Sequence, residues 1–293
     1  MVWLMKKHDA GLSRREVVVA AAGLAGTVAQ AAEGKRKTMS TRQPTLFIAH
    51  GAPPLLDIPQ WVGELGAWGT KLGKPKSILM LSAHWEERPF SLGATKPVPL
   101  VYDFYGFPKH YYETKYPSPG APELAARIKT LVKGTIDEPT RGLDHGAYVP
   151  LVAMYPGADV PVLQASLPTL DPKELIALGR SLAPLRDEGV LIIGSGFITH
   201  NLRMVDWSQT QAPPQWAVEF DQWVAEAVLK KDVDALVQYR TKAPGVNIAL
   251  PTHEHFVPLL VAMGAALEDT KAPEFPIDGF WMATLTRRSV QFG

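Results

Sequence analysis

Four short, uninterrupted apolar runs constrain this chain more than any other feature of its sequence. A strand in which apolar residues follow one another without alternation is buried on both faces, as in a parallel sheet that helices cover on either side. Segments of helical character separate the runs, and strands alternating with helices are typical of α/β proteins. The sequence therefore predicts an α/β fold: a single three-layer domain with a largely parallel central sheet flanked by helices. The runs are TLFIA at 45–49, SILMLSA at 77–83, VPVLQASL at 160–167 and GVLIIGS at 189–195.

The segments between the runs divide into helices and one long irregular stretch. Residues 97–119 are rich in aromatic residues, proline and glycine, so we expect a long loop, and loops of that length are commonly functional. A closing strand is expected at 279–286. Helices are expected at 61–72, 122–132, 146–154, 172–186, 214–230 and 256–266.

The composition excludes several classes of protein. Of 293 residues, 46% are hydrophobic and 20% are charged, which is typical of a globular chain. The net charge of +1 and the lack of a long basic block beyond the N-terminus argue against nucleic-acid binding. The chain has no cysteine, which excludes disulfides, thiolate metal sites and cysteine nucleophiles. Any metal must therefore be bound by histidine, carboxylate or water.

The first 38 residues resemble an export signal. Basic residues, among them Arg14 and Arg15, precede a small-residue apolar stretch at 17–26, and Ala29-Gln30-Ala31 follows as a cleavage-like site. The paired arginines have the form of a twin-arginine signal. We therefore predict a signal segment and linker at 1–38, a catalytic domain at 39–293, a periplasmic location and no membrane anchor in the mature protein. The alternative is translation from Met39, which predicts a cytoplasmic protein.

Histidines follow the predicted strands at the edge where open α/β sheets place their chemistry. His50 ends the first apolar run, His84 ends the second, and His200 follows Gly194-Ser195-Gly196 after the fourth. Adjacent parallel strands with a histidine at each carboxyl end would bring two imidazoles within reach of one ion. Imidazole is the commonest metal ligand in proteins, so the pattern predicts a mononuclear metal enzyme.

Two further motifs contain histidine. In Pro251-Thr252-His253-Glu254-His255 we expect only His255 to ligate, with His253 facing solvent or supporting a ligand. For His145, which stands between Asp144 and Gly146, a role in acid/base catalysis or substrate contact competes with that of a plain loop histidine. Asp103 could bond a ligand histidine, but we expect a solvated loop carboxylate. The aromatic residues that either line a ring pocket or pack in the core are Trp85, Phe104, Tyr105 and Phe107.

Other catalytic motifs are absent from the sequence. The segment around Gly194-Ser195-Gly196 is not a G-x-S-x-G nucleophile elbow, because residue 193 is isoleucine and residue 197 is phenylalanine. There is no G-x-x-x-x-G-K-[ST] phosphate loop and no G-x-G-x-x-G after a strand. His253-Glu254-His255 lacks the H-E-x-x-H spacing of zinc proteases. The histidines therefore remain the strongest indication of chemistry.

Short motifs around these histidines follow one another in order from about residue 44 to the C-terminus. They are Ala49-His50-Gly51, Ser82-Ala83-His84-Trp85, 103–108 (DFYGFP), 142–146 (GLDHG), Gly194-Ser195-Gly196, His200-Asn201-Leu202 and 255–259 (HFVPL). Together they resemble the class III extradiol ring-cleaving dioxygenases, and most closely the 4,5-DOPA extradiol dioxygenase branch.

The resemblance implies one α/β domain that binds one divalent metal ion, Fe(II) or Zn(II). It implies that His50, His84 and His255 hold the metal, and that His200 is a further ligand or the acid/base beside it. His145 would contact substrate or move protons. The substrates would be O2 and a catechol related to DOPA, and the protein would be a monomer or small homo-oligomer. Two alternatives stay open: a zinc-dependent hydrolase and a non-catalytic periplasmic metal-binding protein.

Overall fold

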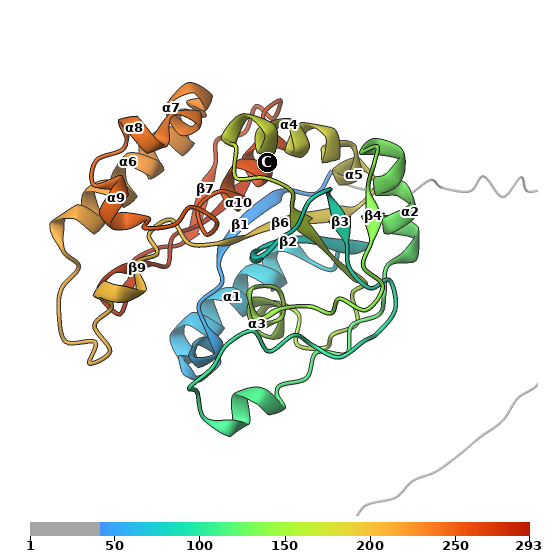
Figure 1. Cartoon of the computed structure of the whole chain (residues 1–293), viewed down its shortest axis with the longest axis horizontal. Coiled ribbons are helices and arrows are strands. Elements are labelled where there is room, and N and C mark those ends of the chain that lie inside the picture. Colours follow the sequence, from blue (N-terminus) through green and yellow to red (C-terminus); the bar gives the residue numbers. More distant parts are fainter. Residues whose placement is uncertain (1–41) are drawn as a thin grey trace, which may run out of the picture. The chain divides into compact units, whose positions relative to one another are not determined.

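The computed structural model describes residues 42–293, and the predicted signal segment at 1–38 lies outside them. The described chain forms a central β-sheet with helices on both faces, as Figure 1 shows. This confirms the predicted three-layer α/β domain.

The central sheet of the described chain has eight strands in the order β4-β3-β5-β2-β6-β1-β10-β7. Its middle four strands, β5, β2, β6 and β1, are parallel, while β10 and β7 add an antiparallel edge. On the other edge β3 runs antiparallel to β5 and parallel to β4. The strands are β1 Thr45–Ala49, β2 Ser77–Glu86, β3 Ser91–Leu92, β4 Ile136–Asp137, β5 Val162–Leu167, β6 Val190–Gly196, β7 Glu274–Ile277 and β10 Ser289–Phe292.

Helices cover the two faces of the sheet unequally. The helices α1 and α3 pack on one face, and α4 and α10 on the other, with α6 beside them (Figure 1). The α-helices are α1 Pro59–Leu72, α2 Pro122–Leu131, α3 His145–Met154, α4 Pro172–Leu182, α5 Pro184–Asp187, α6 Gln215–Leu229, α7 Val233–Val237, α8 Tyr239–Lys242, α9 Val246–Ala249 and α10 Pro258–Gly264. The 3-10 helices are η1 Pro53–Asp57, η2 Lys109–Glu113 and η3 Leu202–Met204. No helix among residues 42–293 has the length and apolar character needed to cross a membrane.

The unbroken apolar runs exist because each strand buries both of its faces. In β1, Leu46 and Ile48 pack with α1 and α3, whereas Phe47 between them packs with α4 and α10. Each of these side chains is fully buried. Consecutive residues of a strand point to opposite faces, so a sheet between two helical layers requires apolar residues at every position.

Three sequence-based expectations are corrected by the structure. The strands β1 and β2 are not adjacent, because β6 lies between them and pairs with both. The segment 279–286 forms a small hairpin of β8 Phe280–Trp281 and β9 Leu285–Thr286, and the strand that closes the sheet is β10. The helix expected at 172–186 is split at Ala183 into α4 and α5, where Pro184 starts the second helix.

Candidate metal centre and active site

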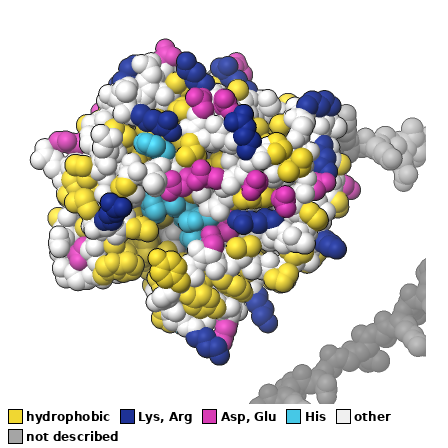
Figure 2. Space-filling model, in the orientation of Figure 1, with side chains coloured by type: hydrophobic (Ala, Val, Ile, Leu, Met, Phe, Trp, Pro, Cys, Tyr) yellow, Lys and Arg dark blue, Asp and Glu magenta, His cyan; other side chains and the backbone are white. Residues whose placement is uncertain are grey.

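Five histidines meet at the carboxyl edge of the central strands. His50 follows β1, His84 lies near the end of β2, and His200 follows β6; His145 begins α3, and His255 precedes α10. Together they line one side of a cavity of about 390 Å³. Histidine side chains are visible on this face of the molecule beside hydrophobic ones (Figure 2). We call these five residues the histidine cluster.

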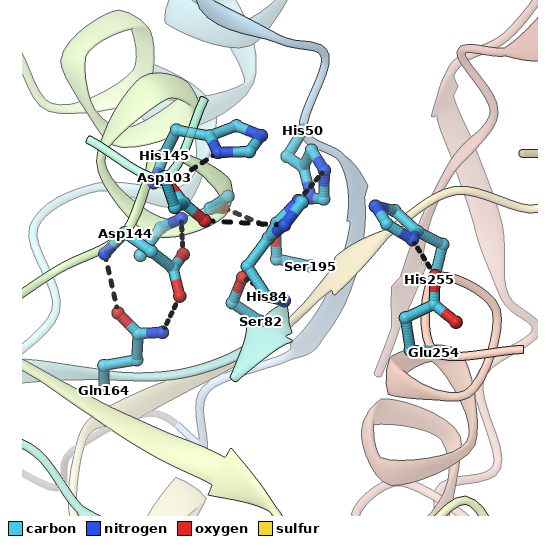
Figure 3. A network of polar contacts seen from close by, with 12 residues as sticks. His50, Ser82, His84, Asp103, Asp144, His145, Gln164, Ser195, Glu254 and His255 are labelled. Carbon is cyan, nitrogen blue, oxygen red and sulfur yellow. Dashed lines mark hydrogen bonds and ion pairs between the residues drawn. The ribbon is translucent and has the colours of Figure 1, made fainter. Parts of the chain in front are cut away.

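Hydrogen bonds fix the protonation of His50. Its Nδ1 lies 2.8 Å from the Ser195 hydroxyl, which itself donates to the Gly146 carbonyl oxygen at 2.5 Å. Because the hydroxyl proton is committed to that carbonyl, Ser195 must accept from the His50 Nδ1–H. The lone pair of His50 is therefore on Nε2, which points at the Nε2 of His84 across 3.2 Å (Figure 3).

A carboxylate orients His255, and a second carboxylate lies near His84. The Nδ1–H of His255 donates to Glu254 Oε1 at 2.9 Å, while its Nε2 is buried without any hydrogen-bond partner. The Nδ1 of His84 lies 3.5 Å from Asp103 Oδ2. A histidine whose Nδ1–H is held by a carboxylate presents a basic Nε2, which is how metal-binding histidines are usually arranged.

The residues present fit a divalent metal ion. His50, His84 and His255 each offer a ring nitrogen, and these atoms lie within 4.8 Å of one another. Two nitrogens bound to one tetrahedral zinc ion lie about 3.4 Å apart, since each Zn–N bond is about 2.0–2.1 Å long. The 3.2 Å between the Nε2 atoms of His50 and His84 is close to that value. A cation between them would also satisfy the orphaned Nε2 of His255.

Burial keeps these imidazoles neutral. It lowers the pKa of His50 and of His255 well below the usual value, and the neighbouring histidines add to the effect. Burial likewise lowers the pKa of His84 to about 3, with a contribution from His145, and that of His200 to about 4. Neutral imidazoles are the form that binds metals, so no proton has to leave these rings at neutral pH.

Asp103 lies in a loop and is exposed, as expected for a solvated carboxylate, but it also lines the cavity and bonds His145. Its Oδ1 accepts from both the backbone N–H and the ring Nδ1 of His145, at 3.1 and 2.8 Å. Although burial acts against ionisation, these bonds and the charges of His145 and His84 lower the pKa of Asp103 to about 2. The carboxylate thereby fixes the His145 tautomer and leaves its Nε2 free to take or give a proton.

The start of α3 is built to place His145. Asp144 caps the helix by accepting from the Ala147 N–H at 3.1 Å, and Gln164 holds the same carboxylate and the Asp144 N–H. Gly146 follows because a Cβ there would lie 2.4 Å from Ser82 Oγ and 3.0 Å from the His84 ring. Glycine therefore lets the helix approach the histidine cluster.

A second close approach places His255. A Cβ on Gly196 would lie 1.9 Å from the His255 carbonyl oxygen, which accepts from the Phe197 N–H at 2.8 Å. Gly196, the last residue of β6, thus lets the backbone of His255 approach the strand closely.

His200 and His253 occupy different positions from the three converging histidines. The His200 ring stacks on His255, with centroids 3.5 Å apart and planes at 12°, and its ring nitrogens group with Glu254 and His255 instead of with His50 and His84. His253 packs against the Tyr239 ring and does not line the cavity. The structure therefore brings three of the four predicted metal residues together, His50, His84 and His255, and places the fourth, His200, beside them.

The remaining cavity surface is largely apolar, and we call it the outer wall. Three of the four predicted aromatic residues belong to it: Phe104, Tyr105 and Phe107. Trp85 does not, which corrects the prediction; it is buried beneath the Arg141 guanidinium, 5.0 Å from its ring centroid. Neighbours in a strand point to opposite faces, so Trp85 turns away where His84 faces the cavity. The outer wall comprises Phe104, Tyr105, Phe107, Leu202, Val205, Trp207, Trp281, Met282 and Leu285.

Comparison with known proteins identifies the family. A family model described as the catalytic LigB subunit of aromatic ring-opening dioxygenase matches residues 61–293. The chain belongs to this family. The match begins after β1, so the place of His50 in the site rests on the geometry above.

Relatives within the family bear similar names. A 4,5-DOPA dioxygenase extradiol of Beta vulgaris is 45% identical over 78% of this chain and 88% of its own. One of Escherichia coli K12 is 38% identical over 87% of this chain and 96% of its own. The crystal structure of an uncharacterized protein of Escherichia coli K12 superposes with a TM-score of 0.72 at 31% identity, covering 86% of this chain and all of that one.

Several residues of this LigB-type site escaped the sequence analysis. Ser195 bonds His50, which is distant in the sequence, and Glu254 bonds His255, its neighbour in the sequence; only the second could have been suggested by position. Trp207 and Trp281 reach the outer wall from distant segments without any local motif. Such partners depend on tertiary folding and carry no spacing signal.

Proposed function

We propose that this protein is a metal-dependent extradiol dioxygenase that opens the ring of a catechol with O2. The observation that carries the proposal is the convergence of three oriented imidazoles, one with an orphaned buried Nε2, on an apolar cavity wide enough for an aromatic ring. Membership of the LigB family supports the same reaction class.

The Nε2 atoms of His50, His84 and His255 would hold the ion. When bound, Fe(II) would supply a Lewis-acidic centre at which the two catechol oxygens and O2 meet. We favour Fe(II) because the reaction consumes O2, although three imidazoles also suit Zn(II).

His145 and His200 would handle protons. Asp103 holds the Nδ1–H of His145, so Nε2 is the atom that accepts a proton from the catechol hydroxyl as the substrate binds. His200 lies stacked on His255 at the side of the three ligands, so we assign it a role in proton transfer to the reacting oxygens and not in metal binding. Both residues line the cavity, where a substrate can reach them.

The outer wall would hold the ring and keep water away. Phe104 packs edge-on against the His145 ring, with centroids 5.8 Å apart, so an aromatic substrate between the histidines and this wall would meet a ring face or edge on each side. Tyr105 and Phe107 extend the same surface.

Oxygen uptake and visible absorbance test the proposal together. The protein is stripped of metal, reloaded anaerobically with Fe(II) or Zn(II), and given unsubstituted catechol and DOPA in air. We expect O2 consumption and a yellow ring-opened product with iron only, and neither in His84→Ala. Absence of turnover with all catechols in the iron-loaded protein would refute the proposal.

The same preparations distinguish the rival activities. Oxygen-independent cleavage of esters or amides by the zinc form would favour a hydrolase that uses metal-bound hydroxide. Tight zinc binding without any turnover would favour a metal-binding protein.

We further propose export of the protein through the segment at 1–38. Fractionation of cells that express the chain tests this: the mature protein should appear in the periplasm and shift to the cytoplasm when Arg14 and Arg15 are both replaced by lysine. Cytoplasmic location of the unaltered chain would support translation from Met39 instead.

A further inference from the structure

We infer that the substrate is a catechol whose ring substituent is apolar and uncharged, and not the amino-acid side chain of DOPA. This inference rests on the proposed function, and it concerns the part of the substrate that points away from the histidine cluster. The composition of the outer wall carries it.

The outer wall offers no cation to a substrate carboxylate. Within residues 42–293, no lysine or arginine lines the cavity, and Asp103 is the one carboxylate that does. Asp103 already accepts two hydrogen bonds from His145 and would repel a second carboxylate. A carboxylate in contact with this surface gains no cationic partner, and any water that it gives up to the apolar side chains is not replaced.

Three arginines near cavity residues in the fold or in the sequence do not offer a cation to the substrate, because each bonds other groups or lies outside the cavity. The Arg141 guanidinium lies over Trp85 and donates to the His84 carbonyl oxygen at 3.2 Å. Arg287 bonds Glu64 and lies over the Trp61 ring. Arg203 is exposed between Leu202 and Met204 but does not line the cavity.

Large apolar side chains are instead left exposed at the cavity. Tyr105 is 92% exposed, Trp207 65% and Leu202 59%, although all three line it. Large apolar side chains rarely gather in contact with water unless a ligand or partner covers them. An alkyl or aryl substituent that leaves the catechol ring on the side away from the hydroxyls would cover these residues, and each apolar contact would favour binding.

Matched substrates test the inference in the iron-loaded protein. We compare 3-(3,4-dihydroxyphenyl)propanoate with its methyl ester, and both with 4-propylcatechol, DOPA and dopamine, using unsubstituted catechol as the reference. We expect kcat/KM for the ester and for 4-propylcatechol to exceed that for the acid and for DOPA by at least about tenfold. Equal or better turnover of the acid, DOPA or dopamine would overturn the inference.

Two variants test whether the outer wall determines the preference for uncharged substrates. Leu202→Arg places a cation at an exposed position of the outer wall and should raise the acid-to-ester ratio of kcat/KM about tenfold. An unchanged ratio in the folded variant would overturn the inference. Arg203→Gln should leave that ratio as in the wild type; a selective loss of acid turnover would show that Arg203 supplies the missing counter-charge and would also overturn it.

Failure of the proposed function is recognisable separately. If catechol itself is not opened, the proposed function fails. If catechol is opened and charged substrates are preferred, only the present inference fails.

Discussion

The two sides of the cavity differ in how they are built. The histidine cluster stands at strand ends and helix starts, and hydrogen bonds hold His50, His145 and His255 in place. The outer wall comes from loops, the short 3-10 helix η3 and a small hairpin, and several of its side chains are exposed. This difference indicates that residues positioned by the sheet determine the reaction, whereas residues in the loops determine substrate selectivity. Loops on a rigid scaffold can change in sequence without disturbing that scaffold.

Removing a metal ligand should have the largest effect on activity, and this effect should be confined to residues of the histidine cluster. We expect His255→Ala to lower activity by about a thousandfold or more and to abolish stoichiometric metal binding, because the ion loses one of three protein ligands. Metal content and turnover are measured on the same preparation. The matched control is His253→Ala, two residues away and outside the cavity, which should keep both; equal losses in the two variants would contradict the assignment.

Removing a partner of a ligand should have a smaller effect. In Glu254→Ala the Nδ1–H of His255 loses its acceptor, so metal affinity should fall about 10- to 100-fold. Competition with a chelator measures the dissociation constant. The exposed residue Glu268 provides a control, since Glu268→Ala should leave the affinity unchanged. Unaltered affinity in Glu254→Ala would show that the carboxylate does not orient the ligand.

Acid should destabilise the metal-free protein through the histidine cluster. The pKa of His84 is lowered to about 3 and that of His200 to about 4 in the folded state, against 6.5 when unfolded. Above pH 6.5 these histidines are neutral in both the folded and the unfolded state, so they do not change the free energy of unfolding. Below pH 6.5 the unfolded chain binds protons that the folded chain cannot bind, so the free energy of unfolding decreases as the pH is lowered.

Urea unfolding at pH 7 and pH 5 measures this loss, which should be at least about 2 kcal/mol. Carboxylates titrate mostly below this window, so the histidines dominate it. The double variant His84→Asn/His200→Asn should lose less than the unaltered protein. Stability that is the same at both pH values would contradict the buried, neutral state of these rings.

A substitution in the outer wall should have the smallest effect on activity and should leave metal binding unchanged. We expect Phe104→Ala to lower kcat/KM for catechols about fivefold, mainly through KM, because the substrate ring loses an aromatic contact. Metal content should stay at the wild-type value. Loss of metal from this variant would show that the two sides of the cavity are not independent.

Much of the fold could be predicted because burial on both faces leaves a plain signal. The strands at 45–49 and 77–83 were found from unbroken apolar runs. The strand β10 was missed because Ser289–Phe292 is short and contains polar residues, and its place follows from pairing with β1. The separation of β1 and β2 by β6 was missed because neighbouring positions in a sequence do not specify neighbouring positions in a sheet.

The site was predictable where residues follow strands and unpredictable where loops return to it. The histidines at strand ends were found, since the carboxyl edge of the sheet is where they must gather. Asp103 could not be placed, because the irregular stretch at 97–119 carries no periodicity to orient it. Trp85 could have been excluded from the cavity, because its neighbour His84 must point to the opposite face of β2.

The location of the metal tests the account most directly. Crystals of the metal-loaded protein, measured on both sides of the absorption edge of the metal, reveal its position by anomalous scattering. We predict one strong peak within about 2.0–2.2 Å of the Nε2 atoms of His50, His84 and His255. A peak among His84, Asp103 and His145, or among His200, Glu254 and His255, would contradict the three-histidine centre on which the account depends.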